Sequence, residues 1–212
     1  MKKIFLLALF LSLASITAYG QIVVTCPAAK PQSNQYRGDV KHRTPGSPTG
    51  TIIGAANMYG FPNVTVAKAG AAKHAPMPGS KETKTFTLNA FLWQAKVEGN
   101  DCEIHLEFND SPTDGNSRRV IVEIPPDPAF NSDYQAILRL VQQTFPGTSN
   151  FGPDVPFRFT SAVHVQVTGF GFFDGVHKGF ASLSRPNGGH GSAAVQTFWE
   201  LHPAWHVIVM TH

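Results

Sequence analysis

The stretch TFTLNAFLWQAKV (Thr85–Val97) sets the fold class of this chain. Its apolar residues occupy every second position from Phe86 to Leu92, which is the spacing of a half-buried β-strand. The run is long for one strand, so we expect it to bend near Phe91. The composition changes at its start, since residues 27–83 are dominated by Gly, Pro, Ser, Thr and Ala.

Further strands and one helix follow in a fixed order. Residues 103–108 and 120–124 alternate in the same way, and Pro125-Pro126 ends the second of these stretches because proline cannot donate to a sheet. Residues 131–145 predict the one good helix. Asn131 or Ser132 can cap it, an apolar stripe runs from Ile137 to Phe145, and Pro146-Gly147 ends it.

The last part of the chain supplies two more strands. Residues 157–159 with 163–168 predict the fourth strand, and residues 197–210, interrupted at Pro203, predict the fifth. The order β-β-β-α-β-β on a chain of this size is that of an OB-fold, a small five-stranded barrel. We therefore predict a mainly β protein with an OB-fold-like barrel over residues 85–212; an open α+β sandwich with the same order is the alternative.

Residues 1–20 have the pattern of a secretory signal peptide. Lys2-Lys3 precede an apolar run over residues 4–13, and Ala18-Tyr19-Gly20 offers small residues for cleavage. The run is shorter than the roughly 20 residues that a spanning helix needs. We expect a secreted or periplasmic protein with no membrane span after the signal is removed.

Residues 21–84 form an irregular, basic N-terminal arm in this prediction. They hold eight Lys and Arg against two acidic residues, whereas residues 85–212 hold seven against twelve. Only residues 51–53 and 63–66 resemble strands within the arm. The arm either covers a substrate or serves as a linker. The acidic barrel lacks the basic footprint that non-specific nucleic-acid binding requires.

The chain has two cysteines, Cys26 and Cys102. In an exported protein a single pair of this kind predicts one disulfide, here joining the arm to the barrel. Closing so long a loop stabilises by about 4 kcal/mol at most in the chain-entropy model. There is no Cys-x-x-Cys pair for redox or zinc chemistry.

Acidic and histidine side chains recur within the apolar strand sequences. Glu103, His105 and Glu107 share one face of a strand, and Glu200 and His202 share a face of the last one. Strands of a small barrel can bring such faces together. The residues that we expect to converge are Asp101, His105, Glu123, Asp174, His177, Glu200 and His202.

Three interpretations of this constellation remain open. Imidazole and carboxylate groups bind divalent ions such as zinc, and the candidate metal ligands are Asp174, His177, Glu200 and His202. A histidine–carboxylate pair can also act as a general base without metal, with Asp174, His177 and His202 as catalytic candidates. Alternatively, these residues are ordinary cross-strand pairs on a solvated face.

Sequence motifs for known chemistries are missing. There is no Gly-x-Ser-x-Gly, no phosphate-binding Gly-x-x-x-x-Gly-Lys and no His-Glu-x-x-His. Aromatic residues near the end of the chain either form a stacking platform for a ligand or belong to the core. In the first case Trp199 is a candidate ligand contact, together with Asp101, His105 and Glu123.

The segments DCEIHLEF, VIVEIP, TGFGFFDGVH and FWELHPAWHVIV together resemble a family of small exported bacterial proteins without an assigned activity. The resemblance covers residues 85–210, leaves the arm unmatched, and implies an OB-like fold and a shared polar site. The residues that match its signature are the seven expected to converge.

These observations favour a secreted OB-fold-like binding domain whose acidic/histidine patch engages an unknown ligand, through a divalent metal or directly. The alternative is a metal-assisted hydrolase of the nuclease type, because phosphodiester cleavage on a barrel needs little beyond clustered acids, a cation and a base. A third hypothesis is an envelope protein that acts only by contacting a partner. The sequence does not decide whether the protein is an enzyme.

Overall fold

The computed structural model describes residues 23–24, 26, 35–62, 64–148, 150–175 and 191–210. The predicted signal peptide and His177 lie outside these ranges. Within them no helix is long and apolar enough to cross a membrane.

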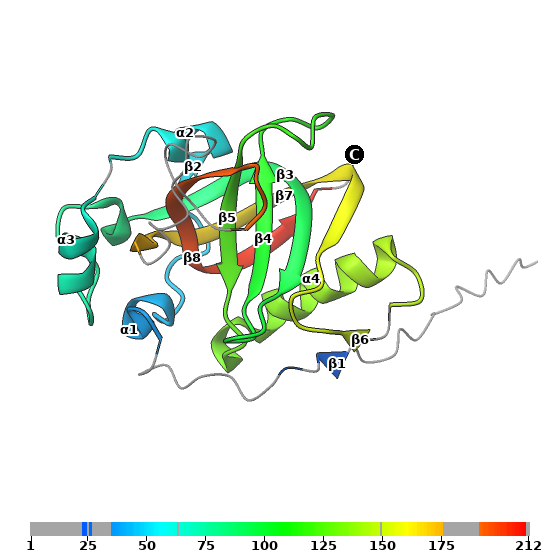
Figure 1. Cartoon of the computed structure of the whole chain (residues 1–212), viewed down its shortest axis with the longest axis horizontal. Coiled ribbons are helices and arrows are strands. Elements are labelled where there is room, and N and C mark those ends of the chain that lie inside the picture. The colour runs from blue at the N-terminus through cyan, green and yellow to red at the C-terminus, as the bar shows by residue number, and fades with distance from the viewer. Residues whose placement is uncertain are drawn as a thin grey trace, which may run out of the picture.

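Five strands close into a barrel. They are β3 (Thr85–Val97), β4 (Ile104–Asn109), β5 (Arg119–Ile124), β7 (Phe157–Phe173) and β8 (Val195–Val209). Their hydrogen-bonded order is β3-β4-β5-β8-β7, and β7 pairs back with β3 to close the ring (Figure 1). Within this ring only the β5–β8 pair is parallel. The predicted OB-fold-like barrel is confirmed, and the open sandwich is excluded because the sheet closes.

The long strand β3 bends, as its length predicts. Its first half pairs with β7 and with the short parallel strand β2 (Thr51–Ile53), and its second half pairs with β4. The ladder is irregular between Leu92 and Gln94, next to the predicted bend. This irregularity lets one strand take part in both halves of the barrel.

The helix α4 (Asn131–Thr144) connects β5 to β7 and lies across one end of the barrel (Figure 1). Its buried stripe includes Ile137, Leu138 and Val141, as predicted. The predicted cap is wrong: the N-cap position is Phe130, which makes no side-chain bond, and the 3-10 turn η3 (Pro128–Phe130) leads into the helix. Asn131 and Ser132 therefore already lie in the first helical turn.

Strand β8 (Val195–Val209) continues through Pro203 without the predicted interruption. It pairs with β7 on both sides of the proline, at Leu201 with Gly171 and at Ala204 with Gly169. The ladder shifts register between Gly169 and Gly171, which accommodates the missing proline donor. Strand β7 contains both stretches that predict the fourth strand, and it also includes the residues between them and extends to Phe173.

The arm contributes to the core. It contains α1 (Gly38–Lys41), α2 (Ala55–Tyr59), α3 (Val66–Ala71) and the 3-10 turn η2 (Lys81–Thr83), in addition to β2. Val40, Met58 and Met77 of the arm are buried. Its composition suggests little burial, but these scattered apolar side chains fill gaps that the barrel leaves at its surface.

The strand expected at residues 63–66 is wrong in its described part. Val64 and Thr65 form no strand, and α3 begins at Val66. The hydroxyl of Thr65 accepts a bond from the Lys68 N–H at 3.2 Å, so N-cap chemistry prevails over the β-branched composition.

The predicted disulfide is present. Cys26 and Cys102 are joined across a sequence separation of 76 residues. Close to Cys26, β1 (Val23–Val24) pairs with β6 (Asn150–Phe151) in a small parallel sheet. The Tyr134 hydroxyl of α4 donates to the Cys102 carbonyl at 2.7 Å, which ties the helix to the disulfide.

Candidate metal centre

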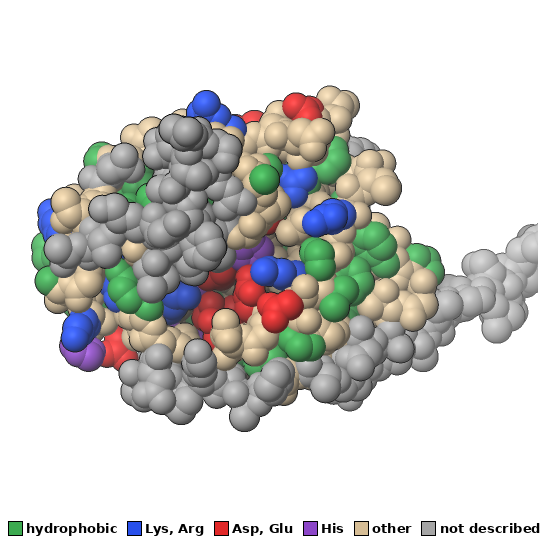
Figure 2. Space-filling view, in the orientation of Figure 1, with side chains coloured by type: hydrophobic (Ala, Val, Ile, Leu, Met, Phe, Trp, Pro, Cys, Tyr) green, Lys and Arg blue, Asp and Glu red, His purple; other side chains and the backbone are tan. Residues whose placement is uncertain are grey.

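The polar face of β4 and β5 is buried, although alternation predicts that it points out of the barrel. Ile104, Leu106 and Phe108 fill the barrel core on one side of β4, while His105 and Glu107 are also fully buried on the other. Figure 2 shows acidic side chains gathered over the ends of these strands, with histidine behind them and basic side chains at their border. The interpretation that these residues lie on a solvated face is therefore wrong, because the face is buried. The interpretation that they form cross-strand pairs is correct for His105 and Glu123, which are partners in the β4–β5 ladder.

Three side chains from three parts of the barrel meet at the centre of this buried face. Glu103 directly precedes β4, Glu123 is the last residue but one of β5, and His202 lies in β8. The Nε2 atom of His202 lies 3.1 Å from Glu103 Oε1, and its Nδ1 atom lies 2.8 Å from Glu123 Oε2. One ligand atom from each residue falls within 4.8 Å of the others, so the three could hold a metal ion.

The arm places a cation beside this group. Lys41, at the end of α1, is 8% exposed, and its Nζ atom lies 3.7 Å from Glu103 Oε2 and 3.8 Å from Glu123 Oε2. These distances exceed those of hydrogen bonds, so the attraction is mainly Coulombic. The ammonium group also lies 5.7 Å from the centre of the Phe172 ring.

Burial and charge oppose each other in the pKa values of this group. Burial lowers the pKa of Lys41, but Glu103 and then Glu123 raise it, and the net result is well above the usual value. The pKa of His202 is likewise raised, because Glu103 outweighs its burial, while His202 and Lys41 lower the pKa of Glu103. The pKa shifts of Lys41, Glu103 and His202 therefore all favour the charged forms of these three groups.

A second acid/histidine group adjoins the first and shares Glu123 with it. The Nδ1 atom of His105 lies 3.1 Å from Glu123 Oε1 and 3.3 Å from Glu98 Oε1. Glu98, His105 and Glu123 also meet the distance condition for a metal group. Glu98 is the more accessible member and pairs with Lys96 at 2.9 Å. The two oxygens of Glu123 thus face two different groups.

Glu107 ends the polar face in a different way. It accepts bonds from the Ser192 N–H at 2.6 Å, from Arg119 at 3.0 Å and from the Gln94 amide at 3.1 Å. Burial alone would raise the pKa of Glu107, but the bonds and charge of His105 and the bonds from Ser192 lower it to about 2. Such a satisfied carboxylate anchors the structure and has little capacity left for a ligand.

The structure groups the predicted site residues differently from the sequence. His105, Glu123 and His202 belong to the two acid/histidine groups. Asp174 and Glu200 are buried near them, since both raise the pKa of Lys41, and Glu200 Oε2 lies 3.9 Å from His202 Nδ1. Of the four candidate metal ligands, only His202 falls in a group with metal-ligand spacing among the described residues, and His177 lies outside those residues.

The two remaining candidates lie at the margin of the site. Asp101 accepts a bond from the Glu103 N–H at 3.4 Å, and its pKa is raised to about 6 by burial and by the charges of Glu103 and Glu123. Trp199 is only 1% exposed, and its indole N–H donates to the Pro62 carbonyl at 3.2 Å. A ligand contact by Trp199 stays a prediction.

Sequence reasoning missed four members of the site. Glu103 lies on the predicted polar face but not among the candidates, and Glu98 lies between two predicted strands. Lys41 and His42 come from the arm, where His42 lies 2.5 Å from Asp127 and 3.5 Å from Glu103. The opposite charges of arm and barrel were the available signal for their attraction, but they could not name the residues.

No protein-family model, curated protein or solved structure matches this chain. The resemblance of its motifs to a family of exported proteins accordingly stays a prediction. The fold and the site define an OB-fold-like domain with a buried acid/histidine group that could hold a cation.

Proposed function

We propose that this protein is a binding domain that holds a divalent metal ion at Glu103, Glu123 and His202 and engages an anionic ligand through that ion. The observation that carries the proposal is the spacing of the three ligand atoms within 4.8 Å in a buried site. Buried charges are costly unless they are paired or bound to metal. Two carboxylates and an imidazole are ligands of divalent metals, and a bound ion would displace the proton that His202 carries.

The donor chemistry indicates which ion fits. Two carboxylate oxygens and one imidazole nitrogen suit zinc and manganese better than calcium, which prefers six to eight oxygens. Three protein ligands leave at least one coordination position for water or for a ligand atom. The contacts of Lys41, at 3.7 and 3.8 Å, show that the two carboxylates already attract a positive charge.

Metal content tests the proposal directly. The mature protein, freed of metal by chelation, is titrated with Zn²⁺ and with Mn²⁺ by calorimetry, and bound metal is then counted by elemental mass spectrometry. We expect one equivalent of metal in the wild type and at least about tenfold weaker binding in His202→Gln and Glu123→Gln.

His164→Gln provides the matched control. His164 is a barrel histidine that stacks on Phe91 and bonds to Asn89, away from the acidic group. It should bind metal as the wild type does. A folded wild type without metal, or equal loss in His164→Gln, contradicts the proposal.

A second candidate function is metal-assisted hydrolysis of a phosphodiester. It is favoured by the position of Glu123, which belongs to both acid/histidine groups. A carboxylate between two acid/histidine groups suits two ions, and two-metal hydrolases hold their ions about 3.5–4 Å apart. Water would add to phosphorus, the bond to the leaving oxygen would break, and the released alkoxide would take up the proton that the water loses. Glu98 and His105 would hold the second ion.

Cleavage of bis(p-nitrophenyl) phosphate with added Mn²⁺ tests this candidate. Hydrolysis should be lost in Glu98→Gln, while the ion held by Glu103 and His202 should still bind. A wild type that binds metal without cleaving this ester supports the binding domain over the hydrolase.

A further inference from the structure

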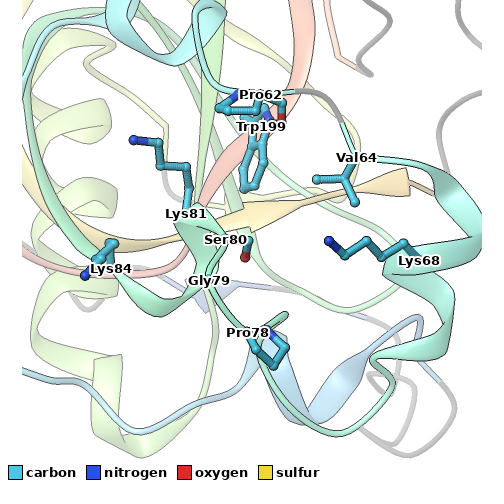
Figure 3. A pocket seen from close by; sticks show the side chains of 9 residues that line it. All are labelled: Pro62, Val64, Lys68, Pro78, Gly79, Ser80, Lys81, Lys84 and Trp199. Carbon is cyan, nitrogen blue, oxygen red and sulfur yellow. Dashed lines mark hydrogen bonds between the residues drawn. The ribbon is translucent and has the colours of Figure 1, made fainter.

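We propose that a separate cationic pocket, formed between the arm and β8, binds a small molecule that carries a phosphate group on a flat apolar ring. The pocket has a volume of about 280 Å³. Its residues are not those of the acid/histidine site, so this inference does not depend on the proposed metal. Figure 3 shows the residues that line it.

Three segments of the chain build the pocket. Pro62 and Val64 come from the loop before α3, Pro78 precedes η2, and Trp199 lies in β8. The Trp199 ring is held by its bond to the Pro62 carbonyl and by an edge contact with Phe61, with ring centres 5.6 Å apart. A fixed aromatic edge and two proline rings make a preformed apolar floor, which lowers the entropic cost of binding a flat group.

Three lysines are among the residues that line this pocket. Lys68 of α3 reaches in from one side, while Lys81 and Lys84 of the η2 region stand on the other (Figure 3). No carboxylate of the described residues lies within 4 Å of any of these three ammonium groups, although such pairs form elsewhere in the arm. The Lys81 ammonium group lies 5.0 Å from the centre of the Phe61 ring, a cation–π contact.

The acidic residue next to Lys81 in the sequence does not line the pocket. Glu82 follows Lys81 directly, but it is fully buried and bound by Arg37. No acidic residue lines the pocket itself. The pocket therefore has a positive potential, and a phosphate dianion gains more from three lysines than a single carboxylate does.

The size of the pocket limits the ligand. Small-molecule sites measure roughly 300–1,000 Å³, so this pocket, at about 280 Å³, lies just below that range. It suits one ring with one phosphate better than a polymer. The space next to Gly79, which lines the pocket, is open: no atom lies within 4 Å of the position that a Cβ would take there.

Phenyl phosphate is the probe for the experiment, with phenol and inorganic phosphate as its two halves. Binding is followed by NMR on the mature protein, using the indole N–H signal of Trp199, which Trp199→Phe assigns. We expect saturable shifts of this signal with phenyl phosphate, while the indole of Trp93, bonded to Asn109 elsewhere in the fold, stays in place. Each half alone should bind at least about tenfold more weakly.

Charge variants complete the test. The triple variant Lys68→Gln, Lys81→Gln, Lys84→Gln should weaken phenyl phosphate binding at least about tenfold, whereas Lys73→Gln, an arm lysine that does not line this pocket, should not. The proposal is overturned if the wild type shows no saturable shift. It is also overturned if phenol or phosphate alone binds as well as the ester, or if Lys73→Gln weakens binding as much as the triple variant.

Discussion

Two buried cations of the arm lie near the Phe172 ring and are held in opposite ways. Arg37 makes a two-pronged ion pair with Glu82, at 2.5 and 2.7 Å. Lys41 approaches Glu103 and Glu123 only to 3.7 and 3.8 Å. Their charged atoms lie 5.2 and 5.7 Å from the ring centre. Similar surroundings thus contain one tight pair and one loose one.

The difference lies in how fully each carboxylate is hydrogen-bonded. Glu82 also accepts from the Met77 and Phe173 N–H groups, at 2.9 and 3.0 Å, so its oxygens have fixed donors on every side. Although burial raises the pKa of Glu82, these bonds and Arg37 lower it overall. The Arg37–Glu82 pair is a structural anchor. The Lys41 contacts are longer than hydrogen bonds, and under the proposed function we expect that a metal ion can take over the role of the ammonium group.

Breaking the tight pair should have the largest effect. Glu82→Gln leaves the Arg37 guanidinium buried without a counter-charge, and we expect the free energy of unfolding to fall by about 3–5 kcal/mol. Chemical denaturation at neutral pH measures the change. Asp39→Asn is the control, because it breaks an ion pair of the same arm in which His74 and Asp39 are both exposed. That change should cost less than about 1 kcal/mol, and an equal cost for both variants would contradict the anchor role.

Removing the loose cation should cost less and should be reversible. Lys41→Met leaves Glu103 and Glu123 with less positive charge, so we expect a loss of about 2 kcal/mol in the presence of chelator. An excess of Zn²⁺ or Mn²⁺ should restore it, because metal at 100 times its dissociation constant stabilises by about 2.7 kcal/mol. Thermal unfolding with chelator and with metal measures both steps.

Arg37→Met sharpens the comparison as the matched control. It removes the other cation near Phe172. Metal should stabilise this variant only as much as it stabilises the wild type, so its deficit should persist, because Glu82 already has its hydrogen-bond donors. If metal rescues both variants equally, or neither, the two regions do not differ as the distances indicate.

The barrel was predictable because its signals are local. Period-two alternation in β3, β4 and β5 and the apolar stripe of α4 each lie within a short window of sequence, and their order determines the topology. Alternation also places Trp199 with Leu201, opposite Glu200 and His202, which agrees with its burial in the core.

The site was predictable only in part. His105, Glu123 and His202 follow from strand faces, but the burial of those faces depends on the arm, and Lys41 is 62 residues or more from the acids it contacts. No local pattern encodes a contact over that separation. The effect of Pro203 is also not encoded locally, since it depends on whether β7 can shift register around the proline in β8.

The smallest expected effect concerns Asp101, at the margin of the loose group. Its pKa, raised to about 6, means that the folded protein binds a proton there more tightly than the unfolded chain does, with its usual value of 3.8. Stability from this residue is therefore lost as pH rises from about 4 to 6. Above that window Asp101→Asn, whose side-chain oxygen can still accept the Glu103 N–H, should stabilise the protein.

We expect this gain to be about 1–2 kcal/mol at pH 7, less than the full pKa shift implies because the side chain is partly exposed. Thermal unfolding of both proteins at pH 3.5, 5 and 7 in the presence of chelator measures it, and the two melting temperatures should converge at the lowest pH. A difference that is the same at all three values would mean that Asp101 does not experience the charges of Glu103 and Glu123. Added metal should shrink the gain at pH 7, because a bound cation offsets the same repulsion that the substitution removes.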